Sequence, residues 1–363
     1  MGNDKKIQLS PEAGSFIRSA PSNPDASVGN SGEAPVSPPA EGGDPSTIPD
    51  MQDVELVDGT YRGRMDFVME KVQADDETRI IRTLLVPDPR RYDVVDRDGE
   101  KFYLDKFLRV LISFEDMRTG MMGQMVGRPI YHLSPSIDST PKYAAARLDA
   151  VRSELQTGEH QAPIEKAIKH TDFYANASAR PIAFLSVDIC GGTAQRRANP
   201  AHFERAYKIF LQELGTVVGQ FNGAILKPTG DGFIALIDYP GFTTQCDNTI
   251  DLGLSLLVVL RDSVNPALKE AGLPELKIRV GADFGQAAIR SIEIPATGFA
   301  FPEVASDALN RAVKIQESCA ANEFRIGRAL YELVHVQWLM RSKKVDFDSN
   351  DIGAANYPVY RVT

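Results

Sequence analysis

The chain has 363 residues, of which 43% are hydrophobic and 25% charged, and its formal net charge is −9. This balance is typical of a globular protein with one or two folded units. The negative charge argues against a role on nucleic acids or at a membrane surface, and no run of about 18 apolar residues predicts a membrane span. The three cysteines, Cys190, Cys246 and Cys319, lie far apart without metal-ligand spacing, which favours a reducing, cytoplasmic location.

The first third of the chain changes character near residue 51. Residues 1–50 are rich in Pro, Ser, Gly, Ala and Asn, so they bury too little apolar surface to fold and are predicted to be a disordered tail. Residues 51–135 carry strand-like runs of Val, Ile, Leu, Tyr and Phe, and the turn sequence Asp96-Arg-Asp-Gly99 is a hairpin signal. We therefore expect a small β-rich domain, whose role the sequence does not indicate.

Residues 136–178 are predicted to form a helical connector of one or two helices. The apolar spacing from Tyr143 to Leu155 suits a helix, and Pro163 is suited to the first turn of a second one.

From residue 179 to 363 the periodicity predicts an α+β domain. Its first six elements follow the order β-α-β-β-α-β, which is the ferredoxin-like arrangement of helices on one face of an antiparallel sheet. The expected ranges are a strand at 182–189, a helix at 200–221, two strands around the turn at 230–232, a helix at 244–264 and a strand at 276–282. A further strand at 286–292 and a helix at 306–319 extend this unit.

Two aspartates stand out in this half of the chain. Asp188 ends an apolar strand-like run, and Asp231 lies in the tight turn Thr229-Gly-Asp-Gly232. A carboxylate at the end of a buried strand is costly unless it is paired or binds a cation. Mg²⁺ takes one or two protein carboxylates and completes its shell with phosphate oxygens and water, and the amides of glycine-rich turns bind phosphates. The pair therefore predicts a site for Mg²⁺ or Mn²⁺ and a polyphosphate.

Four segments carry a resemblance to a known family. They are Phe184-Leu-Ser-Val-Asp-Ile-Cys-Gly-Gly-Thr193, Lys227-Pro-Thr-Gly-Asp231, Ile278-Arg-Val-Gly-Ala-Asp-Phe-Gly285 and Glu303-Val-Ala-Ser-Asp-Ala-Leu-Asn-Arg-Ala-Val-Lys314. Each motif alone has low specificity. Together, in this order and spacing, they resemble the catalytic domain of class III nucleotidyl cyclases over about residues 179–363, roughly half of the chain.

The resemblance implies a two-metal site for a nucleoside triphosphate. It implies that Asp188, Asp231 and the backbone carbonyl of Ile189 hold two Mn²⁺ or Mg²⁺ ions. One ion would lower the pKa of the ribose 3′-hydroxyl, and the other would neutralise charge on the leaving pyrophosphate. The protein's share would be positioning and charge stabilisation. The phosphate oxygens would bind the backbone amides of Cys190, Gly191, Gly192 and Thr193.

The fourth segment supplies the implied catalytic residues. Asn310 matches the family asparagine that orients the ribose. Lys314 lies four residues later on the same helical face and replaces the family arginine that stabilises the developing charge. Lysine provides the charge without the planar fork of arginine.

Other positions depart from the family pattern. Asp283 stands where the family often has histidine, and Ile352 stands where it has a phosphate-binding lysine, for which Lys343 or Lys344 is a candidate substitute.

The two residues at the positions that recognise the base are compatible with either a pyrimidine or adenine. Lys227 matches the residue that reads the base edge in adenylate cyclases, and Glu303 lies where those enzymes have an aspartate. Its extra methylene leaves less room for a purine, which is compatible with a pyrimidine that accepts a hydrogen bond from Lys227. Adenine also fits a lysine donor with a carboxylate acceptor.

With these departures the chain resembles the bacterial pyrimidine cyclases of antiphage defence, which make cyclic UMP or cyclic CMP for a separate effector. We therefore favour UTP or CTP as substrate. An adenylate cyclase is the first alternative, and a degenerate cyclase domain with a regulatory nucleotide-binding role is the second. A diguanylate cyclase or polymerase palm shares the paired carboxylates but gives Asn310 and Lys314 no role. The family builds its sites across a dimer interface, and one complete residue set implies a homodimer with shared sites.

Overall fold

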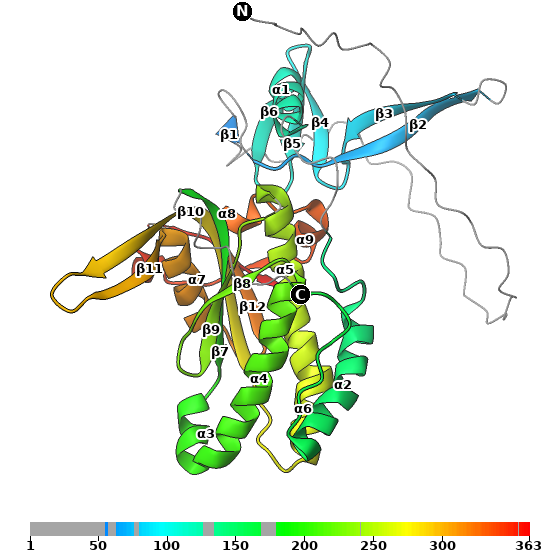
Figure 1. Ribbon diagram of the computed structural model, residues 1–363. Coiled ribbons are helices and arrows are strands. Elements are labelled where there is room, and N and C mark those ends of the chain that lie inside the picture. The colour runs from blue at the N-terminus through cyan, green and yellow to red at the C-terminus, as the bar shows by residue number, and fades with distance from the viewer. Residues whose placement is uncertain are drawn as a thin grey trace, which may run out of the picture. The chain divides into compact units, whose positions relative to one another are not determined.

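Figure 1 shows the computed structural model, which describes residues 55–56, 63–75, 80–125, 134–167, 179–239, 241–354 and 356–363. The tail predicted at residues 1–50 lies outside this set. The described part mixes helices with mostly antiparallel sheets, which confirms the predicted α+β class.

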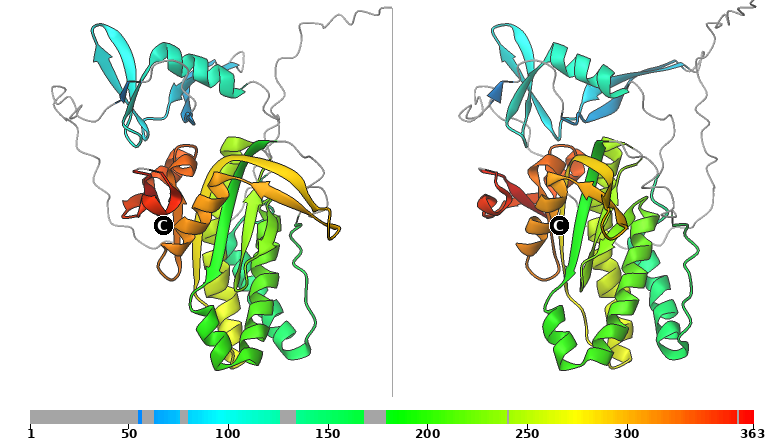
Figure 2. Two further views of the ribbon diagram at one scale, coloured as in Figure 1. Left: turned by 90° about the vertical axis from the view of Figure 1, so that its left-hand side faces the viewer. Right: turned by 60° about the vertical axis from the view of Figure 1, so that its left-hand side comes forward.

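The central sheet has the predicted ferredoxin-like core. Its first four strands are β7 (Arg180–Ile189), β8 (Ala224–Pro228), β9 (Gly232–Ile237) and β10 (Ile278–Ile294). They pair antiparallel in the order β10-β7-β9-β8. The sequence predicted separate strands at 276–282 and 286–292, but both belong to the single long β10. Its second half pairs with β11 (Phe299–Ala305) to form a hairpin that projects from the sheet (Figure 2).

Further strands extend the sheet beyond β10. These are β12 (Glu323–Gly327), which runs parallel to β10, then β14 (Val359–Val362) and β13 (Ser342–Val345). Short helices connect them, namely α8 (Arg328–Tyr331), α9 (Val336–Met340) and the 3₁₀ turn η3 (Ser349–Ile352).

Alternation along β7 divides the core between the two faces of the sheet. Ala183, Leu185 and Val187 join the main core cluster with the helices α4 (Pro200–Gln220) and α5 (Phe242–Val259). Ile182 and Phe184 point the other way and pack with the small side chains of α7 (Asp307–Glu317). Because side chains alternate along a strand, Ser186 and Asp188 share this second face, which we call the α7 face.

One glycine lets α7 lie directly on the sheet. A Cβ at Gly281 of β10 would lie 2.2 Å from the backbone nitrogen of Gln316 and 2.5 Å from the carbonyl oxygen of Ala312. No side chain fits between these backbones, so α7 lies directly against β10, the strand that contains the third motif.

The helices on the opposite face follow the predicted ranges. The first, α4, begins at Pro200 after the N-cap Asn199, whose side chain accepts a hydrogen bond from the His202 amide at 3.2 Å. It follows the short α3 (Gly192–Ala198). The next, α5, continues through a π-helical turn (Leu260–Val264) into α6 (Asn265–Glu270).

The region predicted as a helical connector contains α2 (Thr140–Thr157), which packs against α5 and α6. Residues 163–167 are not helical, so the second helix that Pro163 was expected to open is not present in that range. Residues 168–178 lie outside the described set.

The region predicted as β-rich contains a four-stranded sheet and a separate hairpin. The sheet has the order β1-β6-β5-β4, and its turn between β4 and β5 confirms the predicted hairpin. Asp98 and Gly99 have φ of 57° and 82°, and the Gly99 amide donates to Asp96 Oδ1 at 3.1 Å. The elements are β1 (Glu55–Leu56), β2 (Phe67–Asp75), β3 (Ile80–Pro87), β4 (Tyr92–Arg97), β5 (Glu100–Asp105), β6 (Val110–Ser113) and α1 (Phe114–Met125).

A carboxyl group on α5 makes stability depend on pH. Burial, with a smaller effect of the Asp247 charge, raises the pKa of Asp251 to about 6. The folded chain therefore keeps a proton that the unfolded chain releases, so the free energy of unfolding falls as the pH rises from about 4 to about 6. We expect Asp251→Asn to match the wild type near pH 4 and to exceed it at pH 7 by about 1–2 kcal/mol in urea titrations. An equal difference at both pH values would contradict this assignment.

Candidate functional site

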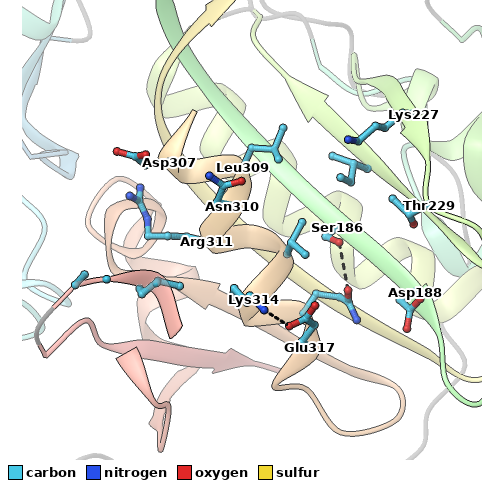
Figure 3. Close-up of a pocket in the computed structure, with 16 residues that line it drawn as sticks. Ser186, Asp188, Lys227, Thr229, Asp307, Leu309, Asn310, Arg311, Lys314 and Glu317 are labelled. Carbon is cyan, nitrogen blue, oxygen red and sulfur yellow. Dashed lines mark hydrogen bonds and ion pairs between the residues drawn. The ribbon is translucent and has the colours of Figure 1, made fainter. Parts of the chain in front are cut away.

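The α7 face holds an open cavity of about 860 Å³ (Figure 3). Its walls come from β7, the β8–β9 hairpin, α7 and the segment after η3. The polar lining includes Ser186, Asp188, Lys227, Thr229, Asp307, Asn310, Arg311, Lys314, Gln316 and Glu317, and Ile352, Gly353 and Ala354 close one side. The cavity therefore gathers residues from three of the four motifs that the sequence singled out.

The β8–β9 turn places Asp231 beside Asp188. Asp188 pairs in register with Gly232, and a Cβ on that glycine would lie 2.0 Å from the Val187 carbonyl oxygen. Gly230 has a φ of 88°, a conformation that glycine adopts readily. The turn is closed by the Thr229 amide, which donates to the Gly232 carbonyl at 3.0 Å. The glycines on both sides of Asp231 are thus required by geometry.

The two carboxyl groups interact directly. Burial raises the pKa of Asp231, and the charge of Asp188 and a hydrogen bond between the two side chains raise it further. The Ile189 amide also donates to the Asp231 carbonyl oxygen at 3.2 Å. Two like charges this close are costly unless a cation sits between them, and hard carboxylate oxygens are the ligands that Mg²⁺ and Mn²⁺ prefer. The donor set fits the divalent ions that the sequence predicted.

Arg279 is a site residue that the sequence analysis did not assign. It lies directly opposite Asp188 in the β7–β10 register and forms an ion pair with Asp188 Oδ2. Its guanidinium also donates to the Glu317 carbonyl at the end of α7, at 3.3 Å. The Arg279 guanidinium therefore already neutralises part of the Asp188 charge, and it links this carboxylate to α7. Its place in the third motif was the only sequence signal.

Part of the glycine-rich turn after β7 already makes contacts within the chain. The Cys190 amide donates to the Lys277 carbonyl oxygen at 2.7 Å. Gly191 has a φ of 70°. Gly192 is buried, and a Cβ there would lie 2.4 Å from Asp231 Oδ2. Thr193, in the first turn of α3, is exposed. Phosphate binding by these four amides stays a prediction, and the Cys190 amide would have to leave an internal partner.

A β-bulge directs Lys227 into the cavity. The β8–β9 register shifts between Ile225 and Lys227, so that Leu226 is an extra residue. Leu226 packs against the α7-face cluster, and without the bulge the next side chain would point to the other face. Lys227 instead lines the cavity and points towards α7 (Figure 3).

The predicted catalytic residues on α7 line the same cavity. Asn310 and Lys314 are four residues apart on one side of the helix, and Lys314 Nζ contacts Glu317 Oε2 at 2.9 Å. The structure thus gathers Asp188, Lys227, Asn310 and Lys314 around one space.

Other predicted residues lie elsewhere. Glu303 is on β11, where it pairs with Arg290 at 2.7 Å, and it does not line the cavity. A different carboxylate, Asp307 on α7, does. Lys343 and Lys344 are exposed on β13 outside the cavity, whereas Ile352 contributes to its wall.

A second group of possible metal ligands lies on the opposite, helical side. Ligand atoms of Glu154, His160 and Glu213 lie within 4.8 Å of one another. Arg147 already binds both oxygens of Glu213, and His160 Nδ1 lies 2.8 Å from Glu154 Oε2. We read this group as an ion-pair network that ties α2 to α4. Among the described residues, no helix is long and apolar enough to cross a membrane.

Comparisons with known proteins find similarity only in solved structures. No family model matches the chain, and no curated protein matches it. The guanylyl cyclase Cya2 is 19% identical, with 51% of this chain and 93% of that chain covered and a TM-score of 0.45. The adenylyl cyclase CyaB from P. aeruginosa is 16% identical, with 51% and 95% covered and a TM-score of 0.44. A class III adenylyl cyclase-like ATP-binding protein from Pseudomonas aeruginosa is 18% identical, with 61% and 43% covered and a TM-score of 0.41. These identities and TM-scores are too low to assign a function to this chain.

Proposed function

We propose that this protein is a nucleotidyl cyclase, which converts a nucleoside triphosphate into a 3′,5′-cyclic nucleotide and pyrophosphate. The observation that carries the proposal is the meeting of Asp188 and Asp231 beside the cavity that Lys227, Asn310 and Lys314 also line. The order and spacing of the four cyclase-like motifs support it independently.

Each residue has a defined task in this proposal. Asp188, Asp231 and the Ile189 carbonyl would hold two Mn²⁺ or Mg²⁺ ions. When bound, such ions activate a hydroxyl and neutralise phosphate charge. Asn310 orients the ribose so that its 3′-oxygen faces the α-phosphorus in line. Lys314 stabilises the charge that develops on the phosphate. To do so, its amine would leave Glu317 and bind a phosphate oxygen instead.

The proposed substrate is UTP or CTP, and the product would act as a second messenger for a separate effector in antiphage defence. Lys227, which lines the cavity, donates to the base. Glu303, one methylene longer than aspartate, lies outside the cavity, and it would favour the smaller pyrimidine only after leaving Arg290 and turning towards the base. ATP is the alternative. The test is to supply each triphosphate at equal concentration with Mn²⁺ and compare initial rates. We expect UTP or CTP to be turned over faster than ATP, and an equal or higher rate with ATP would assign the adenylate cyclase activity instead.

The proposed active form is a homodimer in which the metal-binding aspartates of one copy act together with Lys227, Asn310 and Lys314 of the other, so that the cavity of each chain contributes residues to both sites. The β10–β11 hairpin supports this, because it projects from the sheet with Ile294 and Phe299 45% and 56% exposed (Figure 2). The rings of Phe299 and Phe301 lie 5.3 Å apart and form an apolar surface that a second copy would cover.

Mixing two inactive variants tests the shared site. Asp231→Ala removes a metal ligand and Lys314→Ala removes the charge-stabilising amine. If the sites are shared, one of the two sites in each mixed dimer keeps both residues. With free exchange, half of the dimers in an equal mixture are mixed, so we expect about a quarter of wild-type activity. Each variant alone is the control. Confirmed heterodimers without activity would show that each chain builds its site alone.

The degenerate, regulatory alternative is favoured by one observation. Both key charges already have protein partners, Asp188 with Arg279 and Lys314 with Glu317. A wild type that binds triphosphate but cyclises none of the four, with binding lost in Asp188→Ala, would support this alternative.

A further inference from the structure

Asp283 of β10 is a fully buried carboxylate with two side-chain partners. It is 0% exposed, it forms an ion pair with Arg311, and the Tyr357 hydroxyl lies 3.0 and 2.9 Å from its two oxygens. That hydroxyl also accepts a hydrogen bond from the Ala329 amide at 2.9 Å. Gly327 leaves room for the group, because a Cβ there would lie 2.7 Å from the Asp283 carboxyl carbon.

These partners come from α7 and from the segment after η3, which both contribute walls of the cavity. Arg311 belongs to α7, between Asn310 and Lys314, and Tyr357 follows the cavity-lining residues 352–354 by three positions. The guanidinium of Arg311 also lies 5.2 Å from the Tyr357 ring centre. One buried carboxylate thus connects the helix that presents the catalytic side chains with the segment that closes the cavity beside Ile352.

Arg311 anchors the first half of α7. The buried residues in that half are the small Ala308 and Ala312, and the backbone of the helix rests on Gly281. The last turns have buried contacts of their own through Ile315 and Gln316. Between the two alanines, Arg311 binds Asp283 and donates to the Phe284 carbonyl oxygen at 3.2 Å, so it holds the part of the helix that carries Asn310.

We propose that Asp283 is a positioning residue for the cyclase site, which acts through Arg311 and Tyr357 to fix the direction of Asn310 and Lys314 relative to the metal carboxylates. This inference rests on the proposed function. Asp283 touches neither substrate nor metal ligand in this role. A displacement of about 1 Å in a catalytic group reduces turnover by roughly 100-fold, so the position of α7 is worth as much as a direct contact.

A buried ion pair also stabilises the fold, and a double variant separates the two roles. Asp283→Asn alone leaves the Arg311 charge without a counter-ion and destabilises the chain. Asp283→Asn combined with Arg311→Gln removes both charges, so we expect its thermal unfolding temperature to return towards the wild type. If Asp283 positions α7, the kcat of this double variant with UTP or ATP and Mn²⁺ stays about 10- to 100-fold below the wild type.

Tyr357→Phe tests the same role without a change in charge and without altering a cavity residue. We expect its kcat to fall by about tenfold, with little change in unfolding temperature and with wild-type Mn²⁺ binding, measured by electron paramagnetic resonance without nucleotide. Tyr360→Phe is the matched control, because this tyrosine stacks on Tyr331 at 3.7 Å between ring centres, away from Asp283; it is expected to keep wild-type kcat.

The outcomes distinguish this inference from the proposed function. Wild-type kcat in both the double variant and Tyr357→Phe, while the wild type itself cyclises UTP or ATP, would overturn the positioning role alone. Loss of Mn²⁺ binding in Tyr357→Phe would overturn it as well, because the damage would then reach beyond α7. A wild type that forms no cyclic nucleotide would overturn the proposed function, and the positioning role with it.

Discussion

Asp188→Asn is expected to lower turnover by about a hundred- to a thousandfold while the chain stays folded. The substitution keeps the shape of the side chain but removes the charge that two divalent ions would share with Asp231, and loss of one charge-stabilising group in a site of this kind costs roughly 10²–10³ in rate. Mn²⁺ stabilises a protein that binds it only in the folded state. We therefore expect Mn²⁺ to raise the unfolding temperature of the wild type and not that of the variant.

A matched control lies at the other end of the same strands. Asp238 follows β9 and pairs with Arg180 of β7 at 2.8 Å, as Asp188 pairs with Arg279 of β10. Both aspartates are partly exposed, at 23% and 20%, so the two substitutions break similar ion pairs. Asp238→Asn is expected to keep turnover and the Mn²⁺ effect. Equal losses in the two variants would mean that Asp188 serves the sheet and not a metal.

Glu213→Gln is expected to lower the free energy of unfolding by about 3–5 kcal/mol. Glu213 on α4 accepts two hydrogen bonds from Arg147 on α2, at 2.7 and 2.6 Å, and the side chains are 1% and 5% exposed. Removing one member of such a pair leaves a buried charge unpaired, which is far more costly than the pair itself is stabilising. Urea unfolding at pH 7 measures the loss.

The comparison for this variant is another ion pair of α2 with the same geometry. Glu270 of α6 accepts two hydrogen bonds from Arg152 of α2, also at 2.7 and 2.6 Å, but the side chains are 53% and 37% exposed. Water screens this pair, so Glu270→Gln is expected to change the free energy of unfolding far less than Glu213→Gln does. Similar costs for the two variants would contradict the view that burial decides the value of these ion pairs.

Much of the fold could be predicted because its signals are local. The apolar run that ends at Asp188, the proline that begins α4 and the Asp-Gly turn of the β4–β5 hairpin each lie within a few residues of sequence. The α+β class and the β-α-β-β-α-β order follow from such patterns. Residue spacing also indicated that Asn310 and Lys314 share one side of a helix.

The features that the sequence did not reveal depend on register and on distant contacts. Arg279 meets Asp188 because β10 pairs with β7 across 91 positions of sequence. Lys227 reaches the cavity only through a bulge, and a bulge has no local pattern here that distinguishes it from a regular strand. Asp283 was noticed as a departure from the family pattern, but its partner Tyr357 is 74 residues away.

The most direct test of the account is to identify the product. Purified protein is incubated with UTP, CTP, ATP and GTP in separate reactions with Mn²⁺, and the products are analysed by mass spectrometry. We expect a 3′,5′-cyclic mononucleotide and pyrophosphate in equal amounts with at least one triphosphate, and at least about a hundredfold less of both with Asp188→Asn. A dinucleotide, a linear product, or no product from any of the four would contradict it.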